Sequence, residues 1–271
     1  MASPPARRDA APSGLPAFSD RAEAGVLLGG ALRKVLGDFQ SHDPERVRAG
    51  ADPSAMAADD RRRRPVVFAI PRGGVAVAAG VARALGAPLD VLMVRKIGHP
   101  AAPELGLGAI AEDGSGGAAE PYFDAEMLSR VGLTKDDLAP VVARERAELA
   151  RRVEVYGGVS RARLREPASA GGAGDLAGRL VVVVDDGLAT GVTARAALRA
   201  VRARGAARTV LAVPVAAPSA AEAIKKETDE VVTLVTPRRF RSVGEWYVDF
   251  DQLTDADVLT ILSSGGTPAP A

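Results

Sequence analysis

The stretch VVVVDDGLATGVT, residues 181–193, decides the fold, because four valines lead into two acids and a turn of small residues. Consecutive β-branched residues are typical of a strand that is covered on both faces, as the central strands of a parallel sheet are. Ligands of such sheets bind at the carboxyl ends of the strands. Asp185 and Asp186 fall at this position, so we expect them to face a ligand.

The turn after the two acids leads into a helix that begins near Val192. Its backbone N–H groups and the positive end of the helix dipole suit a phosphate monoester. Thr190 and Thr193 add hydroxyl donors, and Gly191 lets the backbone approach closely. Two carboxylates would repel the phosphate, but they can accept hydrogen bonds from sugar hydroxyl groups. The pattern therefore predicts a site for a sugar phosphate.

The composition excludes several other kinds of site. The chain has 271 residues, 47% hydrophobic and 25% charged, and its net charge of +1 gives no global field for nucleic acid or an anionic membrane. The absence of cysteines excludes disulfides and thiolate metal sites. With only His42 and His99, the composition also argues against a multi-histidine metal centre. The N-terminus lacks the apolar core of a signal peptide, and no apolar run approaches the ~20 residues that span a bilayer. We expect a cytoplasmic protein with no nucleic-acid or membrane partner.

Strands and helices alternate in two repeats, which predicts an α/β fold with a doubly wound parallel sheet. The first repeat has strands at 65–70 and 88–96 around a helix with Gly86 as its C-cap. The second repeat and its continuation have strands at 180–186, 208–216 and 229–237, with helices at 192–205 and 218–227. A small hood is expected from the N-terminal helix at 20–36, with Ser19 as N-cap, and from the C-terminal segment, whose short helix is capped by Thr254.

We expect one domain over residues 18–262, between disordered tails at 1–17 and 263–271. Within it, the composition predicts a flexible lid at 96–121, a long helix at 134–157 that starts at a Thr134 cap, and a flexible connection at 165–178. The arginine run at 61–64 is typical of a solvated linker, because no aromatic residues are interleaved with it.

Two adjacent acids have other interpretations. They occur in simple solvated turns, and a Walker B strand also ends in this way. No G-x-x-x-x-G-K-[ST] motif precedes the strand, which argues against a nucleotide triphosphatase. GLGA at 106–109 matches part of a dinucleotide fingerprint, but it follows no clear strand and opens no clear helix. A solvated turn and a sugar-phosphate site are the alternatives that stay open.

Residues 181–193 resemble the phosphoribosyl pyrophosphate (PRPP) signature of type I phosphoribosyltransferases, in which hydrophobic residues, two acids and a turn of the A-T-G-x-T type follow one another. The resemblance implies that Asp185 and Asp186 hold the ribose hydroxyls. It also implies a 5′-phosphate site made by Ala189, Thr190, Gly191, Val192 and Thr193.

Two upstream segments are similar to the same family. IPRGG at 70–74 looks like its pyrophosphate loop, which implies that Arg72, Gly73 and Gly74 bind pyrophosphate; a tight strand-to-helix turn is the alternative. VRKIGHP at 94–100 is similar to a strand-end pattern of adenine phosphoribosyltransferases. This implies a pyrophosphate role for Arg95 and Lys96, where a solvated strand end is the alternative, and His99 departs from the pattern.

Both ends of the chain strengthen the resemblance. FSDRAEAG at 18–25 and VGEWYVDF at 243–250 look like segments of a bacterial phosphoribosyltransferase-like group without a settled substrate. By analogy with hypoxanthine-guanine enzymes, Trp246, Tyr247 and Asp249 would lie near the acceptor base, with Phe240 stacking on it. The alternative is an aromatic cluster that packs the C-terminal helix.

The resemblance implies a magnesium- and PRPP-dependent transferase of nucleotide salvage that acts on a nitrogenous, purine-like base. Asp185, Asp186, Arg72 and Lys96 would be its catalytic residues, with Mg2+ at the two aspartates directly or through water. Glu104 and Glu112 are the acids of the expected lid and the candidates for proton transfer to or from the acceptor. The alternatives are a PRPP-sensing regulator without turnover, and hydrolysis or transfer to another acceptor. The oligomeric state stays open, with a homo-oligomer as one expectation.

Overall fold

The computed structural model describes residues 16–40, 65–164 and 176–263. Several predicted features lie wholly or mostly outside these residues: the two tails, the arginine run at 61–64 and the connection at 165–178.

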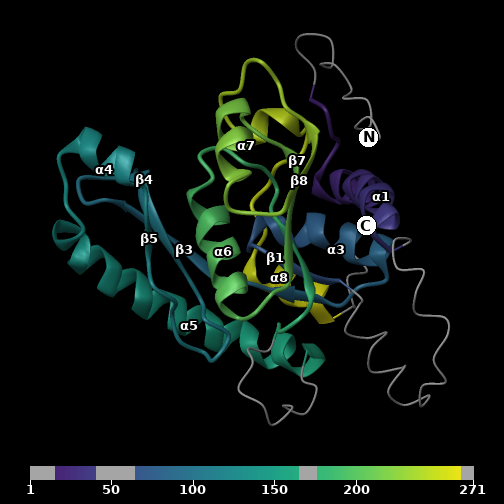
Figure 1. Cartoon of the computed structure of the whole chain (residues 1–271), viewed down its shortest axis with the longest axis horizontal. Coiled ribbons are helices and arrows are strands. Elements are labelled where there is room, and N and C mark those ends of the chain that lie inside the picture. The colour runs from purple at the N-terminus through teal and green to yellow at the C-terminus, as the bar shows by residue number, and fades with distance from the viewer. Residues whose placement is uncertain (1–15, 41–64, 165–175, 264–271) are drawn as a thin grey trace.

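A parallel sheet forms the centre of the described chain (Figure 1). Its five strands run in the order β2-β1-β6-β7-β8 and all pair in parallel. The chain moves outward from β1 to β2 and later from β6 to β8, so the strand order reverses between β1 and β6, a position at which α/β sheets bind ligands. The bounds are β1 Val66–Ala69, β2 Leu89–Val91, β6 Leu180–Val184, β7 Arg208–Val215 and β8 Glu230–Val235.

Helices cover both faces of this sheet, which confirms the predicted doubly wound architecture. The valines of β6 alternate between the two faces: Val182 and Val184 join the core beneath α3 and α1, whereas Val181 and Val183 pack with α6 and α7. All four valines are fully buried. The helices of the first face are α1 Arg21–Gln40, α3 Gly73–Leu85 and α8 Asp255–Ser263, and those of the second are α6 Val192–Ala203 and α7 Pro218–Ile224.

The N-terminal helix α1 packs tightly on α3 through glycines. A Cβ atom built on Gly25 would lie 2.4 Å from the carbonyl oxygen of Val77, and one on Gly80 would lie 2.5 Å from the carbonyl carbon of Gly25. The two backbones can therefore approach this closely only without side chains at these positions. The N-cap differs from the predicted Ser19, since the Asp20 side chain accepts the hydrogen bond from the Glu23 N–H at 2.7 Å.

The segment between β2 and α5 differs most from the prediction. The strand expected at 88–96 is two strands, because the chain leaves the parallel sheet after β2 and enters a second, antiparallel sheet of order β3-β4-β5. Much of the expected lid is therefore strand. A helix that the sequence pattern did not predict, α4, follows β5. The bounds are β3 Val94–His99, β4 Ala102–Ala111, β5 Tyr122–Phe123 and α4 Ala125–Val131.

The expected long helix consists of a 3-10 turn, η2 Asp136–Leu138, and α5 Ala139–Leu164. Thr134 caps this start reciprocally with Asp137, and Thr254 and Asp257 form the same arrangement at α8. Gly86 ends α3 with a φ of 58°, as predicted for its C-cap. A further 3-10 turn, η3 Gly244–Trp246, lies within the predicted aromatic segment.

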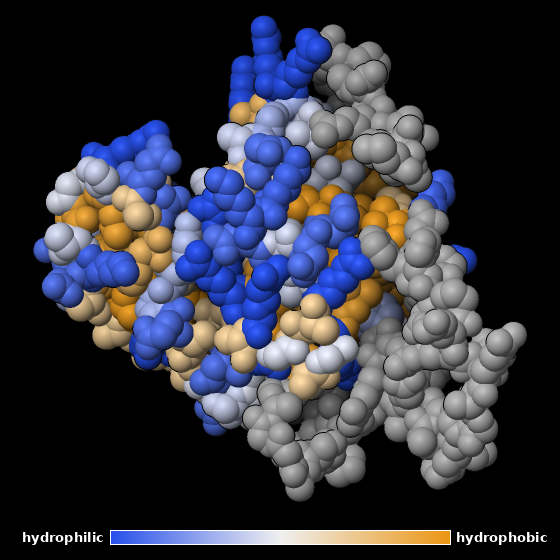
Figure 2. Space-filling model, in the orientation of Figure 1, coloured by the Kyte–Doolittle hydropathy of each residue, from blue (hydrophilic) through white to orange (hydrophobic). Residues whose placement is uncertain are grey.

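The hydropathy of the surface differs between two regions. Figure 2 shows hydrophobic residues gathered on the lobe of the antiparallel sheet, α4 and α5, and mostly hydrophilic residues over α6. A hollow of about 370 Å3 on this lobe is lined by residues that include Phe123, Val142, Lys135 and Arg146. Among the described helices, none has the length and apolar character needed to cross a membrane.

The glycine contact between α1 and α3 can be tested with two matched variants of α1. We expect Gly25→Ala to destabilise the protein by about 1–3 kcal/mol, because the new methyl group collides with the α3 backbone. Gly30→Ala is the control: Gly30 is exposed with no atom near its Cβ position, so alanine should stabilise by about 0.5–1 kcal/mol. Denaturant unfolding measures both changes, and equal effects at the two positions would contradict the packing account.

Candidate active site at the switch point of the sheet

The two acids and the PRGG segment lie side by side at the carboxyl edge of the sheet. Asp185 and Asp186 follow β6, and the Ile70 N–H after β1 donates to the Val184 carbonyl at 2.9 Å. A Cβ atom on Gly73 would lie 1.9 Å from Oδ2 of Asp186, and one on Gly74 would lie 2.9 Å from the Val184 carbonyl oxygen. Both glycines are therefore required for this close approach. The two segments that the family resemblance assigns to ribose and pyrophosphate meet here.

A cation from the N-terminal helix completes this site. Nε of Arg21 donates to Oδ2 of Asp186 at 2.9 Å, and Nη1 donates to the Asp251 carbonyl at 2.8 Å. The guanidinium carbon lies 3.7 Å from the centroid of the Phe250 ring. No role was predicted for Arg21 from the sequence, although the FSDRAEAG segment that carries part of the family resemblance contains this residue.

The pKa values of the two carboxyl groups are both raised. Burial raises the pKa of Asp185 well above its ordinary value, and the neighbouring charge of Asp186 raises it further. Burial also raises the pKa of Asp186, but the charge and hydrogen bond of Arg21 oppose that rise. The Asp186 N–H donates to Oδ1 of Asp185 at 2.9 Å. Asp185 is thus the carboxyl group with the less compensated charge.

The predicted phosphate turn begins at a buried, hydrogen-bonded residue and continues with two exposed residues. The Leu188 N–H donates to the Val215 carbonyl at 2.9 Å, and Leu188 is buried. Ala189 and Thr190, by contrast, are exposed. Gly191 is the N-cap of α6 with a φ of 78°, which favours glycine. The turn is therefore exposed at Ala189 and Thr190, whereas Gly191 and Val192 at the start of α6 are buried and Thr193 is half-buried.

The expected pyrophosphate cations are each paired within the protein. Nη1 of Arg72 lies 3.9 Å from the Asp255 carboxylate of α8. The peptide bond between Pro71 and Arg72 is cis. Lys96 donates to the backbone carbonyl of Glu104 within the β3–β4 hairpin. The structure thus brings Asp185, Asp186, Gly73 and Gly74 together, with Arg72 beside Gly73, and places Arg95 and Lys96 on the neighbouring antiparallel sheet.

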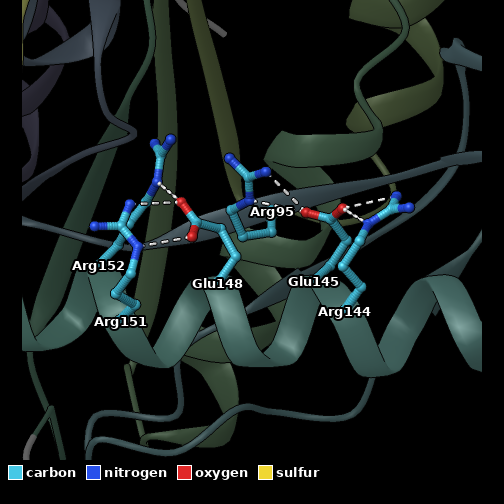
Figure 3. A network of polar contacts seen from close by, with 6 residues as sticks. All are labelled: Arg95, Arg144, Glu145, Glu148, Arg151 and Arg152. Carbon is cyan, nitrogen blue, oxygen red and sulfur yellow. Dashed lines mark hydrogen bonds and ion pairs between the residues drawn. The ribbon is translucent and has the colours of Figure 1, made fainter.

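Arg95 belongs to a polar network along α5 (Figure 3). Its Nη2 lies 2.8 Å from the carboxylate of Glu145, which is buried and also binds Arg144. One turn further along, Glu148 accepts hydrogen bonds from Arg151 and Arg152, which lower its pKa to about 2. Arg95 is therefore oriented by α5.

The C-terminal aromatic segment packs on the N-terminal one. Tyr247 is buried, and its hydroxyl donates to the main-chain carbonyl of Asp186 at 2.6 Å. Its ring centroid lies 5.3 Å from that of Phe18 and 5.0 Å from that of Phe250. Trp246 is half-buried and Asp249 is exposed. These contacts bring the predicted hood directly to the carboxylate pair.

The acids of the expected lid are placed differently from each other. Glu112 follows β4, and its side chain accepts the Met93 N–H at 3.0 Å, so it has a structural contact. Glu104 is exposed within β4. A proton-transfer role for either acid stays a prediction.

The described residues suit a magnesium ion only when another molecule supplies most of its oxygen ligands. No group of three or more His, Cys, Asp or Glu side chains within residues 16–40, 65–164 and 176–263 could hold a metal ion. Arg21 occupies Oδ2 of Asp186, and an N–H group occupies Oδ1 of Asp185. Mg2+ usually keeps several waters or phosphate oxygens as ligands, so these carboxylates fit an ion that arrives with pyrophosphate.

Comparisons with known proteins identify the family. Residues 40–250 match the phosphoribosyl transferase domain family. A protein of Mycobacterium tuberculosis H37Rv, provisionally named a phosphoribosyl transferase, is 40% identical over 218 residues, which cover 80% of this chain and 46% of that protein. The crystal structure of TT1426 from Thermus thermophilus is similar with a TM-score of 0.63 and 39% identity, over 91% of this chain and 98% of that one.

The chain belongs to the phosphoribosyl transferase family, and its five-stranded parallel sheet is typical of the type I core. It spans about half the length of the curated relatives that it matches.

The electrostatics of Asp185 lead to a pH-dependent prediction. Because the pKa of Asp185 is raised in the folded protein, its ionised form destabilises the fold, and this cost grows as the pH rises above about 4, the pKa of an unfolded aspartate. We therefore expect Asp185→Asn to raise the melting temperature at pH 7, by about 2–4 °C for each kcal/mol of relieved repulsion.

The gain should shrink towards pH 4, where the wild-type carboxyl group becomes protonated. Thermal unfolding of both proteins between pH 4 and pH 8 measures it. Asp136→Asn, at an exposed residue of η2, is the control and should show no such pH dependence. A loss of stability at pH 7 on Asp185→Asn would contradict the account.

Proposed function

We propose that the protein transfers the 5-phosphoribosyl group of PRPP to a nitrogenous base and releases pyrophosphate. The observation that carries this proposal is the meeting of the PRGG turn and the two acids at the switch point of the sheet, where Gly73 approaches Asp186. A turn that is exposed at Ala189 and Thr190 leads from the acids into α6. A sugar that carries phosphate groups at opposite ends matches this arrangement.

In the proposed reaction, a nitrogen of the base attacks C1 of the ribose while the C1–oxygen bond to pyrophosphate breaks. Pyrophosphate leaves with the electron pair, and the base loses one proton. Asp185 and the free oxygen of Asp186 accept hydrogen bonds from the ribose hydroxyls. The 189–193 turn binds the 5′-phosphate. The site acts by positioning and by stabilising the departing charge.

Pyrophosphate would lie over the backbone N–H groups of Gly73 and Gly74, with Arg72 beside it. Magnesium enters as part of the substrate, bound to pyrophosphate oxygens and reaching Asp185 directly or through water. Arg95 and Lys96 would contribute charge from the β3–β4 hairpin, and Lys96 has to leave the Glu104 carbonyl to do so.

We further propose that the acceptor is purine-like and binds under the hood, with Trp246 and Asp249 near it. What supports this placement is the contact of the hood with the acids, since Tyr247 donates to the Asp186 carbonyl. Tyr247 itself is buried in the aromatic cluster, so the half-buried Trp246 and the exposed Asp249 are the side chains available to a base.

The test is pyrophosphate release from PRPP and magnesium across a panel of purine and pyrimidine bases, with a reaction without base as the control. We expect release with a subset of bases, and a fall of about 100-fold in Asp185→Asn, the scale of losing one positioned polar contact. Asp136→Asn, far from the acids in the chain and exposed, should keep full activity.

Release that does not depend on any base would identify a hydrolase instead. PRPP binding in calorimetry without release for any base would favour a PRPP-sensing protein. No binding of PRPP by the folded protein would contradict the proposed site itself.

A further inference from the structure

Arg21 is buried at the centre of the hood and makes three separate interactions. Its side chain is 10% exposed and forms the ion pair with Asp186, the hydrogen bond to the Asp251 carbonyl and the stack on Phe250. A guanidinium with three such partners is fixed in orientation. Two of the three partners lie outside the carboxylate pair, so its position does not depend on Asp186 alone.

The guanidinium of Arg21 holds one of the two carboxylate oxygens of Asp186. Nε donates to Oδ2 at 2.9 Å, and Gly73 lies so close to the same oxygen that a Cβ atom there would be 1.9 Å away. With both acids ionised, the side chains of Asp185, Asp186 and Arg21 have a net charge of −1, whereas the two acids alone have a charge of −2. Hard divalent cations bind more tightly where more ligand charge is available.

We propose that Arg21 is the resident cation of the ribose-binding acids: it keeps free divalent metal from binding to them and orients Asp186 so that only Oδ1 is left for the substrate. The proposal rests on the proposed function only for the identity of that substrate. Arg21 acts through Asp186, so it is a positioning residue contributed by the N-terminal helix.

The arrangement has a consequence for how magnesium reaches the site. A metal ion that finds no room at the free carboxylates has to enter already bound to pyrophosphate, and it then meets Asp185 as the less compensated acid. Arg21 keeps its place during this step, because the Asp251 carbonyl and the Phe250 ring hold it independently of the substrate.

The test is a Mn2+ titration of the free protein, without PRPP or base, followed by the electron paramagnetic resonance of unbound Mn2+. We expect no stoichiometric binding by the wild type up to about 1 mM, the weak limit of protein sites for hard cations. Arg21→Gln should bind one Mn2+ at least tenfold more tightly, because the second charge and Oδ2 become available. Arg21→Gln/Asp186→Asn should lose this binding again.

Arg199→Gln is the matched control, since it removes an arginine whose ion pair with Glu227 is remote from the site, and it should behave as the wild type. Circular dichroism establishes that each variant is folded. Stoichiometric Mn2+ binding by the wild type, or no gain in a folded Arg21→Gln, would overturn the proposal. If Arg21→Gln does not fold, stoichiometric Mn2+ binding by the wild type would still overturn the proposal.

This experiment uses neither PRPP nor turnover. Its failure therefore leaves the proposed transferase activity untouched, and a failure of the activity assay leaves the metal-exclusion result valid.

Discussion

Two neighbouring carboxylates at the end of the central strand impose the constraint that shapes this site. β6 is buried on both faces, so Asp185 and Asp186 leave the core together and their repulsion has to be compensated locally. The ion pair with Arg21 compensates the charge of Asp186. The Gly73 turn lies close to the same carboxylate, and the Tyr247 hydroxyl donates to the main-chain carbonyl of Asp186. The N-terminal helix, the first strand–helix turn and the C-terminal segment therefore all contact Asp186, and the N-terminal helix supplies the compensating charge.

The cations around the site are also paired with groups of the protein. Arg72, Arg95 and Lys96 were expected to bind pyrophosphate, and each has a partner within the protein: Asp255, Glu145 and a backbone carbonyl. Of the two ion pairs, that of Arg95 is the shorter, at 2.8 Å against 3.9 Å for Arg72, and its partner Glu145 is buried on a long helix. Such pairs keep positive side chains ordered before an anion arrives, and an anion that binds them must exchange one partner for another.

Much of the fold could be predicted from local patterns. The valine run of β6, the small-residue turn and the Gly86 and Thr254 caps depend on neighbours in sequence, and the structure has all of them. The prediction was wrong at 88–96, where one apolar run contains two strands of different sheets, and it missed α4. Glycines made β4 resemble a loop, although its hydrogen bonds to β3 hold it as a strand.

Arg21 could not be assigned for another reason: 165 residues separate it from Asp186, and no periodicity links the two. Arg21 also lies outside the region that matches the family. The region that matches the family runs over residues 40–250, so it omits both Arg21 and Asp255, the partner of Arg72. A chain trimmed to those limits would keep the sheet, the acids and the glycine turn, yet the guanidinium beside the acids would be gone. Domain boundaries drawn from sequence similarity would thus separate charged residues of the site from their ion-pair partners.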